Sequence, residues 1–118
     1  MNLFAYLDQH GIQYERHDHP AVFTVEEANR LVPKLPGAKT KNLFLKDKKG
    51  ERHILVVVPH DRSVDLKAFA SVMEAKKITL ASPDRLMTHL ELEPGAVSIL
   101  GIVNDRRGAV EVVVDTAI

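Results

Sequence analysis

The stretch "TKNLFLKDKKGERHILVVVP", residues 40–59, predicts the centre of the fold. Two β-rich runs, "NLFLK" at 42–46 and "RHILVVVP" at 52–59, are joined by "DKKG", which is a typical hairpin signal. The second run is apolar at every position from Ile54 to Val58, so we expect a strand that is covered on both faces.

Helices and an extended segment are predicted before this hairpin. Residues 2–9 carry apolar side chains at helical spacing, and Gly11 favours a helix end there. Residues 12–19 have an extended pattern. Thr24 is a suitable N-cap for a further helix that stops at Pro33.

The chain after the hairpin alternates between helix and strand patterns. We expect a helix in 64–74 capped by Asp65 or Ser63, a short strand in 76–81, a helix from Pro83 to about Leu90 capped by Ser82, a loop and strand in 93–105, a turn at "RRG", and a last strand in 109–115. The mixed order favours one α+β domain over residues 1–118, with a mixed, mostly antiparallel β-sheet flanked by helices.

The bulk properties fit one globular domain without disulfides. The 118 residues are 45% hydrophobic, and 16 basic residues balance 16 acidic ones, so a nucleic-acid contact must come from a local patch. The chain has no cysteine. The N-terminus has no signal-peptide pattern, and no apolar segment approaches the roughly 20 residues that span a bilayer. We therefore expect a cytoplasmic protein that makes no membrane contact.

Lys41 is the first candidate for chemistry. Alternation along a strand places it on the side of Leu43 and Leu45, at the strand's beginning. A lysine partly withdrawn from water is suited to bind a carbonyl or phosphate oxygen. The alternative is a lysine whose stem packs on the strand end while its ammonium stays in solvent.

Three further features have a functional and a structural interpretation. The basic residues between Lys39 and Arg52 could hold a phosphate backbone or form a solvated turn. The loop "EPGAVSILG" offers Gly95, Ser98 and backbone N–H groups for an oxyanion, or is an ordinary turn. The six histidines, including His17 and His19, show no metal-binding spacing and no nucleophile motif, so we expect no metal site.

Five segments together resemble the YbaK and prolyl-tRNA-synthetase-associated domain family, above all its free-standing ProX-type deacylases. They are "HPAVFTVEEA", "LPGAKTKNLFLKDKKG", "VDLKAFA", "ASPDRLMTHLELEPGAVSILGIVND" and "VEVVVD", and the resemblance runs from about residue 17 to residue 115. The resemblance implies a trans-editing hydrolase that cleaves the ester between a wrong amino acid and a transfer RNA. A synthetase pocket rejects a ligand as small as its own only weakly, so a second site must edit.

The resemblance also implies a set of site residues. Lys41 would be the catalytic residue that holds the aminoacyl ester. The substrate-binding residues would be Thr24, Asn42, Gly95, Ser98, Gly101 and Asn104, and the tRNA-binding residues would be Lys39, Lys46, Lys48 and Lys49. Ile99 stands where the family's G-x-x-x-P loop has proline. The family continues past "VVVDTAI" with a histidine-proline-asparagine segment, so this chain is expected to be a short or shortened member.

The implied reaction is ester hydrolysis without a metal, a cofactor or a covalent enzyme intermediate, with backbone N–H groups of 95–98 stabilising the oxyanion. The expected substrate is alanine on the proline tRNA, and cysteine on the same tRNA is the alternative. Two other readings stay open: a non-catalytic tRNA-binding module, and a hydrolase or binder for another acylated ligand. A prolyl-tRNA synthetase partner is an open expectation, and the oligomeric state is not predicted.

Overall fold

The computed structural model describes residues 2–16, 18, 37 and 39–118. Contacts between Cα atoms divide these residues into two compact units, residues 2–37 and 38–118, which we describe separately. The predicted helix at 24–33 and its cap Thr24 lie outside the described residues.

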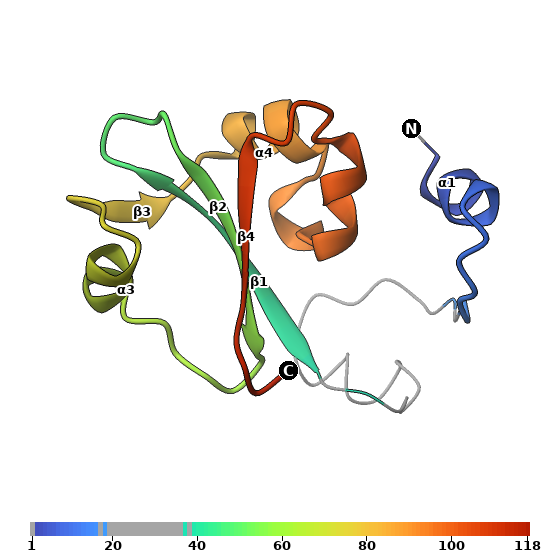
Figure 1. The fold of residues 1–118 in the computed structure, drawn as a ribbon, viewed down its shortest axis with the longest axis horizontal. Coiled ribbons are helices and arrows are strands. Elements are labelled where there is room, and N and C mark those ends of the chain that lie inside the picture. Colours follow the sequence, from blue (N-terminus) through green and yellow to red (C-terminus); the bar gives the residue numbers. More distant parts are fainter. Residues whose placement is uncertain (1, 17, 19–36, 38) are drawn as a thin grey trace. The chain divides into compact units, whose positions relative to one another are not determined.

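A four-stranded mixed sheet forms the larger unit (Figure 1). Its order is β3-β1-β2-β4, and β1 pairs antiparallel with both β2 and β3, whereas β4 runs parallel to β2. The strands are β1 (Thr40–Asp47), β2 (His53–Pro59), β3 (Ile78–Leu80) and β4 (Val110–Val114). The predicted hairpin and the predicted α+β fold with a mostly antiparallel sheet are confirmed.

Short helices connect the strands, and polar side chains cap them as the sequence predicts. The helices of this unit are α3 (Leu66–Val72), α4 (Pro83–Leu90) and the 3-10 helices η1 (Pro94–Ala96) and η2 (Ile99–Asn104). Asp65 accepts from the N–H groups of Lys67 and Ala68 at the start of α3, so Asp65 rather than Ser63 is the cap. Ser82 accepts from the Arg85 N–H at the start of α4.

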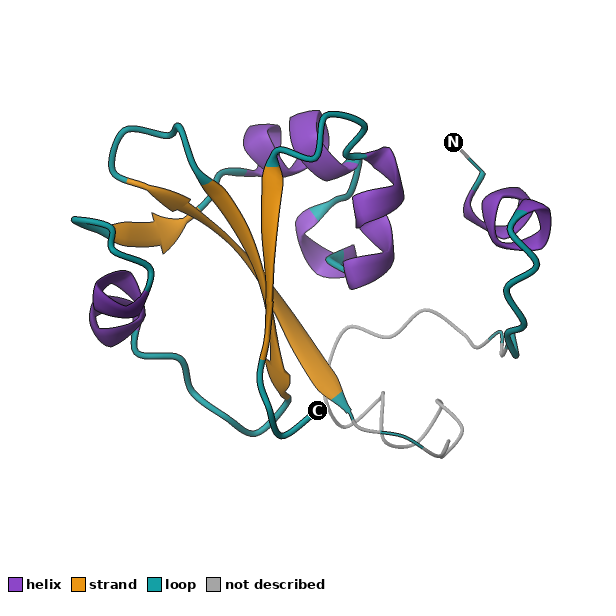
Figure 2. Ribbon diagram, viewed as in Figure 1, coloured by secondary structure: helices purple, strands orange, loops and turns teal. Residues whose placement is uncertain are grey.

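Helices cover both faces of the sheet (Figure 2). On one face, α3 packs on a cluster that contains Leu45, Ile54 and Val56. On the other face, α4 and the 3-10 helices pack on a cluster that contains Phe44 and Leu55. Six consecutive residues of β2, from His53 to Val58, are buried, which confirms the prediction of a strand covered on both faces.

The predicted strand within residues 93–105 is wrong, because this segment forms η1 and η2 instead. Ser98 accepts from the Leu100 N–H and so caps η2. Gly101 is buried against Leu92, where the side chain of any other residue would collide. Val97 and Ile99 pack on the α4-side core, so the segment covers the sheet rather than adding a strand to it.

The unit of residues 2–37 contains α1 (Leu3–Gln9) among its described residues. Asn2 caps α1, and Gly11 adopts a positive φ of 66° just after its end, which confirms the predicted helix and its stop. Residues 12–16 form no regular strand. The Arg16 guanidinium lies over the Phe4 ring at 4.3 Å.

Candidate functional site

A small apolar pocket lies where the "KNLF" strand meets α4 and the turn at 94–97. It has a volume of about 290 Å³, and we call it the Asn42 pocket. The structure therefore brings together residues of two motifs that lie about 50 positions apart in the sequence. Its described lining residues are Asn42, Leu43, Phe44, Leu80, Ala81, Pro83, Leu86, Pro94 and Val97.

Asn42 offers polar groups at the edge of this pocket. The bonds from the His60 N–H to the Lys39 carbonyl and from the Asp47 N–H to the Arg52 carbonyl show that the odd-numbered residues of β1 bond to β2. The even-numbered residues therefore direct their backbone groups to the opposite edge. There Phe44 accepts from the Ala81 N–H, and β3 pairs with β1 only from Leu45 onward.

The backbone N–H and C=O of Asn42 consequently face the part of the β1 edge that no described strand pairs with. The Asn42 Oδ1 atom is also buried and has no hydrogen-bond partner in the described part of the chain. A buried polar atom without a partner costs about 1–3 kcal/mol, so the Asn42 Oδ1 is suited to accept a hydrogen bond from a water or a ligand.

Lys41 is half-buried and lies on the other face of β1 from the Asn42 side chain. It is opposite Val58, which belongs to the α3-side core, and this places it on the side of Leu43 and Leu45 as predicted. Lys41 is not among the described residues that line the Asn42 pocket. No described residue accepts a hydrogen bond from its ammonium.

The turn at 94–97 forms one wall of the pocket, but some of the groups predicted for this loop already form hydrogen bonds inside the protein. Gly95 is exposed, and the space around its Cα is open to a ligand. The Ala96 N–H already donates to the Glu93 carbonyl at 2.9 Å. The Ser98 side chain caps η2, so its hydroxyl has a structural role.

Ile99 occupies the first position of η2, where proline is well tolerated. Ser98 before it is extended, with φ −143° and ψ 146°, and this is the conformation that a residue before proline adopts. Isoleucine at 99 is thus compatible with the backbone that a proline would favour, and its side chain adds to the α4-side core.

Gly101 and Asn104, both predicted to bind substrate, lie away from the described lining of the Asn42 pocket. Gly101 is buried against Leu92. The Asn104 side-chain N–H donates to the Leu90 carbonyl at 2.9 Å and ties the end of η2 to the end of α4. The structure thus gives both residues packing or bridging contacts.

The basic cluster of residues 39–52 is divided by the length of β1. At about 3.3 Å per residue, the eight residues of β1 separate Lys39 from Lys48 and Lys49 by more than 25 Å. Lys48 and Lys49 are exposed at the hairpin turn, whereas Lys46 is half-buried and bonds to the Asp47 carbonyl at 3.4 Å.

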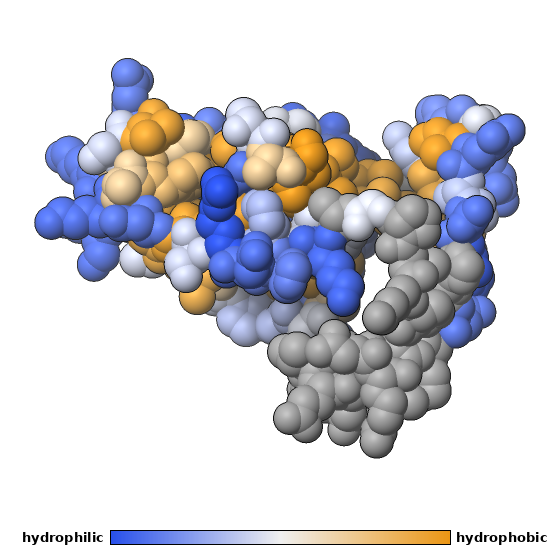
Figure 3. Space-filling model, turned by 90° about the horizontal axis from the view of Figure 1, so that it is seen from below, coloured by the Kyte–Doolittle hydropathy of each residue, from blue (hydrophilic) through white to orange (hydrophobic). Residues whose placement is uncertain are grey.

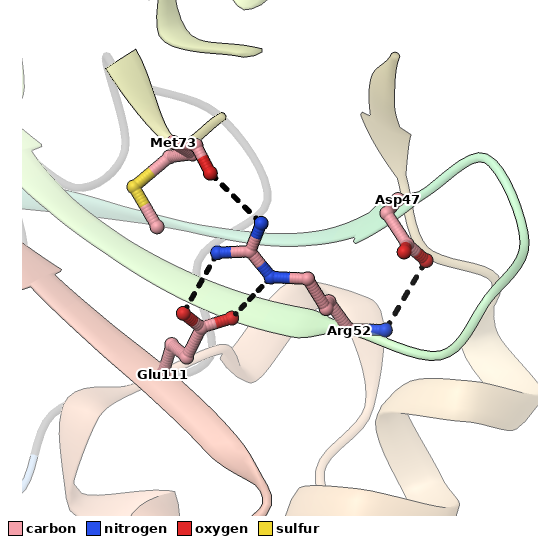
Figure 4. Close-up of polar contacts among 4 residues, drawn as sticks. All are labelled: Asp47, Arg52, Met73 and Glu111. Atoms are coloured by element: carbon pink, nitrogen blue, oxygen red, sulfur yellow. Dashed lines mark hydrogen bonds and ion pairs between the residues drawn. The ribbon is translucent and has the colours of Figure 1, made fainter. Parts of the chain in front are cut away.

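Arg52 at the same turn is occupied by contacts inside the protein (Figure 4). Its guanidinium binds both carboxylate oxygens of Glu111, at 2.9 and 2.8 Å, and the Met73 carbonyl at 2.8 Å. These hydrogen bonds lower the pKa of Glu111. Its backbone N–H donates to Asp47. Arg52 therefore joins β2, β4 and the end of α3.

His53 is a buried polar residue that the sequence analysis did not single out. It is 4% exposed, its ring lies 4.0 Å from the ring of His89, and its Nε2 lies 3.1 Å from an Arg85 nitrogen. Since arginine only donates, His53 Nε2 accepts in this contact. Burial lowers the pKa of His53, and the positive charge of Arg85 together with His89 lowers it further. The ring of Phe44 stacks on it at 5.7 Å.

Polar and apolar side chains alternate on the surface of residues 39–118. Seen from the side where β1 begins, hydrophilic side chains form a band across the middle, with apolar surface on both sides (Figure 3).

Within the described residues, no group of three or more histidine, cysteine or acidic side chains is placed to hold a metal ion. None of the helices described is long and apolar enough to cross a bilayer.

Comparison with known proteins assigns this chain to a family. The profile of the aminoacyl-tRNA editing domain matches residues 19–118, so the chain belongs to that family. The resemblance inferred from the sequence motifs is thereby confirmed.

Three relatives illustrate the similarity. The prolyl-tRNA editing protein ProX of Acetoanaerobium sticklandii is 41% identical over 113 residues, which are 96% of this chain and 69% of that protein. The prolyl-tRNA synthetase associated domain-containing protein 1 of Danio rerio is 39% identical over 96% of this chain and 61% of its own length. The human protein described as its putative counterpart is 37% identical over 91% of this chain and 64% of its own length.

Proposed function

We propose that this protein edits mischarged transfer RNA by hydrolysing the ester that joins a wrong amino acid to the terminal adenosine of the proline tRNA. The observation that supports this most is the Asn42 pocket, which unites the "KNLF" strand with the turn at 94–97. Membership of the editing family, and the similarity to a protein described as a prolyl-tRNA editing protein, support the same reaction.

In this proposal the Asn42 pocket receives the aminoacyl group. The side chain of the amino acid would lie against Phe44, Leu86 and Val97. The backbone C=O of Asn42, on the edge that no described strand pairs with, and its buried Oδ1 would bind the α-ammonium or the terminal ribose, since an ammonium and a hydroxyl are both donors. The pocket would thus hold the substrate through hydrogen-bond acceptors at Asn42 and through contacts with an apolar wall.

Lys41 is the proposed charged group of the reaction. Its strand is unpaired by described residues on the pocket side from Thr40 to Leu43, so the flexible lysine side chain has an open edge to reach around. There it would polarise the ester carbonyl while water attacks the carbonyl carbon and the ribose oxygen leaves as a free hydroxyl. The exposed amide groups around Gly95 would stabilise the developing oxyanion. No covalent intermediate, metal or cofactor is part of this proposal.

The pocket favours small amino acids. Its volume of about 290 Å³ is at the lower limit for a ligand site, and its walls are mostly apolar. Such a pocket selects by size, at about 1–3 kcal/mol per methylene group, and therefore separates alanine from proline better than it separates alanine from cysteine. We propose alanine as the substrate, and cysteine as the alternative.

A deacylation assay on proline tRNA charged with alanine, cysteine or proline tests the proposal. We expect rapid hydrolysis of the alanyl ester, and a loss of at least about a hundredfold in Lys41→Ala, the scale of removing one group that stabilises the oxyanion. Asn42→Ala should raise the KM. Lys67→Ala, which removes an exposed lysine of α3, is the matched control and should hydrolyse normally. Wild-type turnover in Lys41→Ala would remove this lysine from the mechanism.

A second candidate function is a tRNA-binding module without catalysis. The side chain of Lys41, on the other face of β1 from that of Asn42, favours this alternative. Tight binding of the tRNA together with an absence of ester hydrolysis by the wild-type protein would support it.

A further inference from the structure

A second hollow lies beyond the Asn42 pocket, between the last turn of α4 and the turn that precedes β4. It has a volume of about 430 Å³, and we call it the Arg106 pocket. Its basic side chains come from segments that are separate in the sequence, and Asn104 is the lining residue that was predicted from the sequence to bind substrate. Its described lining residues are Thr88, His89, Asn104, Asp105, Arg106, Arg107 and Ala109.

The turn that carries the two arginines is held rigidly. The two carboxylate oxygens of Asp105 accept from the N–H groups of Ala109, at 3.0 Å, and Val110, at 2.8 Å. Gly108 closes the turn with a φ of 61°, and its N–H donates to the Asp105 carbonyl. The backbone that presents Arg106 and Arg107 is thus fixed before any ligand binds, so little entropy is lost there on binding.

Arg106 and Arg107 are exposed, and neither has a carboxylate partner among the described residues. Asp105 is the nearest acidic side chain in the sequence, and both of its carboxylate oxygens accept hydrogen bonds from backbone N–H groups. The carboxylate of Glu111, at the start of β4, is bound by Arg52. Two adjacent guanidinium groups thus remain available for an external anion, and guanidinium binds phosphate through paired hydrogen bonds.

The Arg106 pocket and the Asn42 pocket share one helix. Leu86 lines the Asn42 pocket and His89 lines the Arg106 pocket, and they are neighbours on α4, about 5 Å apart along its axis. The Asn104 bond to the Leu90 carbonyl joins η2 to the end of this helix.

We propose that the Arg106 pocket binds a backbone phosphate of the RNA strand whose terminal nucleotide enters the Asn42 pocket. This inference rests on the proposed function for the nature of the ligand. Arg106 and Arg107 would bind the phosphate oxygens, and His89 would form the opposite wall. These contacts carry no sequence information, and they would hold the strand in register.

Binding of an uncharged hairpin RNA with a single-stranded 3′ end tests the inference without any hydrolysis. Affinity is measured by fluorescence anisotropy over a series of salt concentrations, for wild type and for the double variant R106Q/R107Q. We expect the variant to bind about tenfold or more weakly, and the slope of log affinity against log salt to fall by about 1 to 2. Inorganic phosphate alone is a second probe, and its binding is expected to be much weaker than that of the RNA.

The matched control is K76Q/K77Q, which removes two adjacent exposed charges before β3. Equal losses in both double variants would show that only net charge matters, and would overturn the inference. Wild-type affinity and slope in R106Q/R107Q would overturn it as well. Failure of the deacylation assay with a retained effect of R106Q/R107Q on RNA binding would reject the proposed hydrolysis and support the phosphate site.

Discussion

Replacement of Gly101 by alanine separates a packing role from a substrate-binding role at that position. An added Cβ would lie 2.5 Å from Leu92 Cδ1, 3.2 Å from Leu92 Cγ and 3.4 Å from Leu90 Cβ. The closest of these atoms is the end of a half-buried side chain, which moves at moderate cost. Overpacking of this kind costs about 1–3 kcal/mol.

A second effect of alanine on the free energy of unfolding is stabilising and offsets part of the overpacking cost. Alanine restricts the unfolded chain and so stabilises a protein by about 0.4–1 kcal/mol where the native backbone tolerates it. Gly101 has no positive φ, so its backbone tolerates alanine. We therefore expect Gly101→Ala to lower the free energy of unfolding by about 1–2 kcal/mol, which is about 4 °C or more in Tm for a domain of this size.

Urea unfolding of a double-mutant cycle with Leu92→Ala tests this estimate. Once Leu92 is shortened the collision is gone, so Gly101→Ala should then be neutral or stabilising, and the coupling should be about 1–2 kcal/mol. Gly95→Ala is the matched control, because nothing lies within 4 Å of its added Cβ, and its stability should stay within about 0.5 kcal/mol. If Gly101→Ala is equally destabilising in both backgrounds, or loses hydrolysis at unchanged stability, the packing argument is wrong.

Two further predictions concern His53 and the hairpin lysines. Because the folded state lowers the pKa of His53, its neutral form is favoured, and its contribution to stability is fully present above the unfolded pKa of about 6.5 and lost as the pH falls below it. The unfolding free energy of wild type should therefore fall more between pH 7.5 and pH 5.5 than that of His53→Phe; equal pH profiles would contradict the assignment. In the RNA-binding assay, the variant K48Q/K49Q should weaken binding and reduce the salt slope, whereas an unchanged slope would remove the hairpin turn from the RNA-binding surface.

The sequence by itself predicted most of the elements of this fold, because the signals that set their ends are local. The caps Asp65 and Ser82 bond to N–H groups two or three positions away, and Gly11 ends α1 through its own backbone conformation. The continuous apolar run of β2 likewise indicates, from the sequence alone, that this strand is buried on both faces. The motifs of the editing family could also be recognised in the sequence, since each is a short continuous stretch of the chain.

Only the tertiary structure decided which of these motifs lie close together in space. The segment 99–104 has the composition of a strand, yet it packs on the α4-side core and forms a 3-10 helix because packing outweighs local β propensity. Lysines close in the sequence are carried to opposite ends of β1 by its extended backbone. The polar edge at Asn42 and the burial of His53 depend on strand pairing and helix packing, which join residues far apart in the chain and leave no local signal.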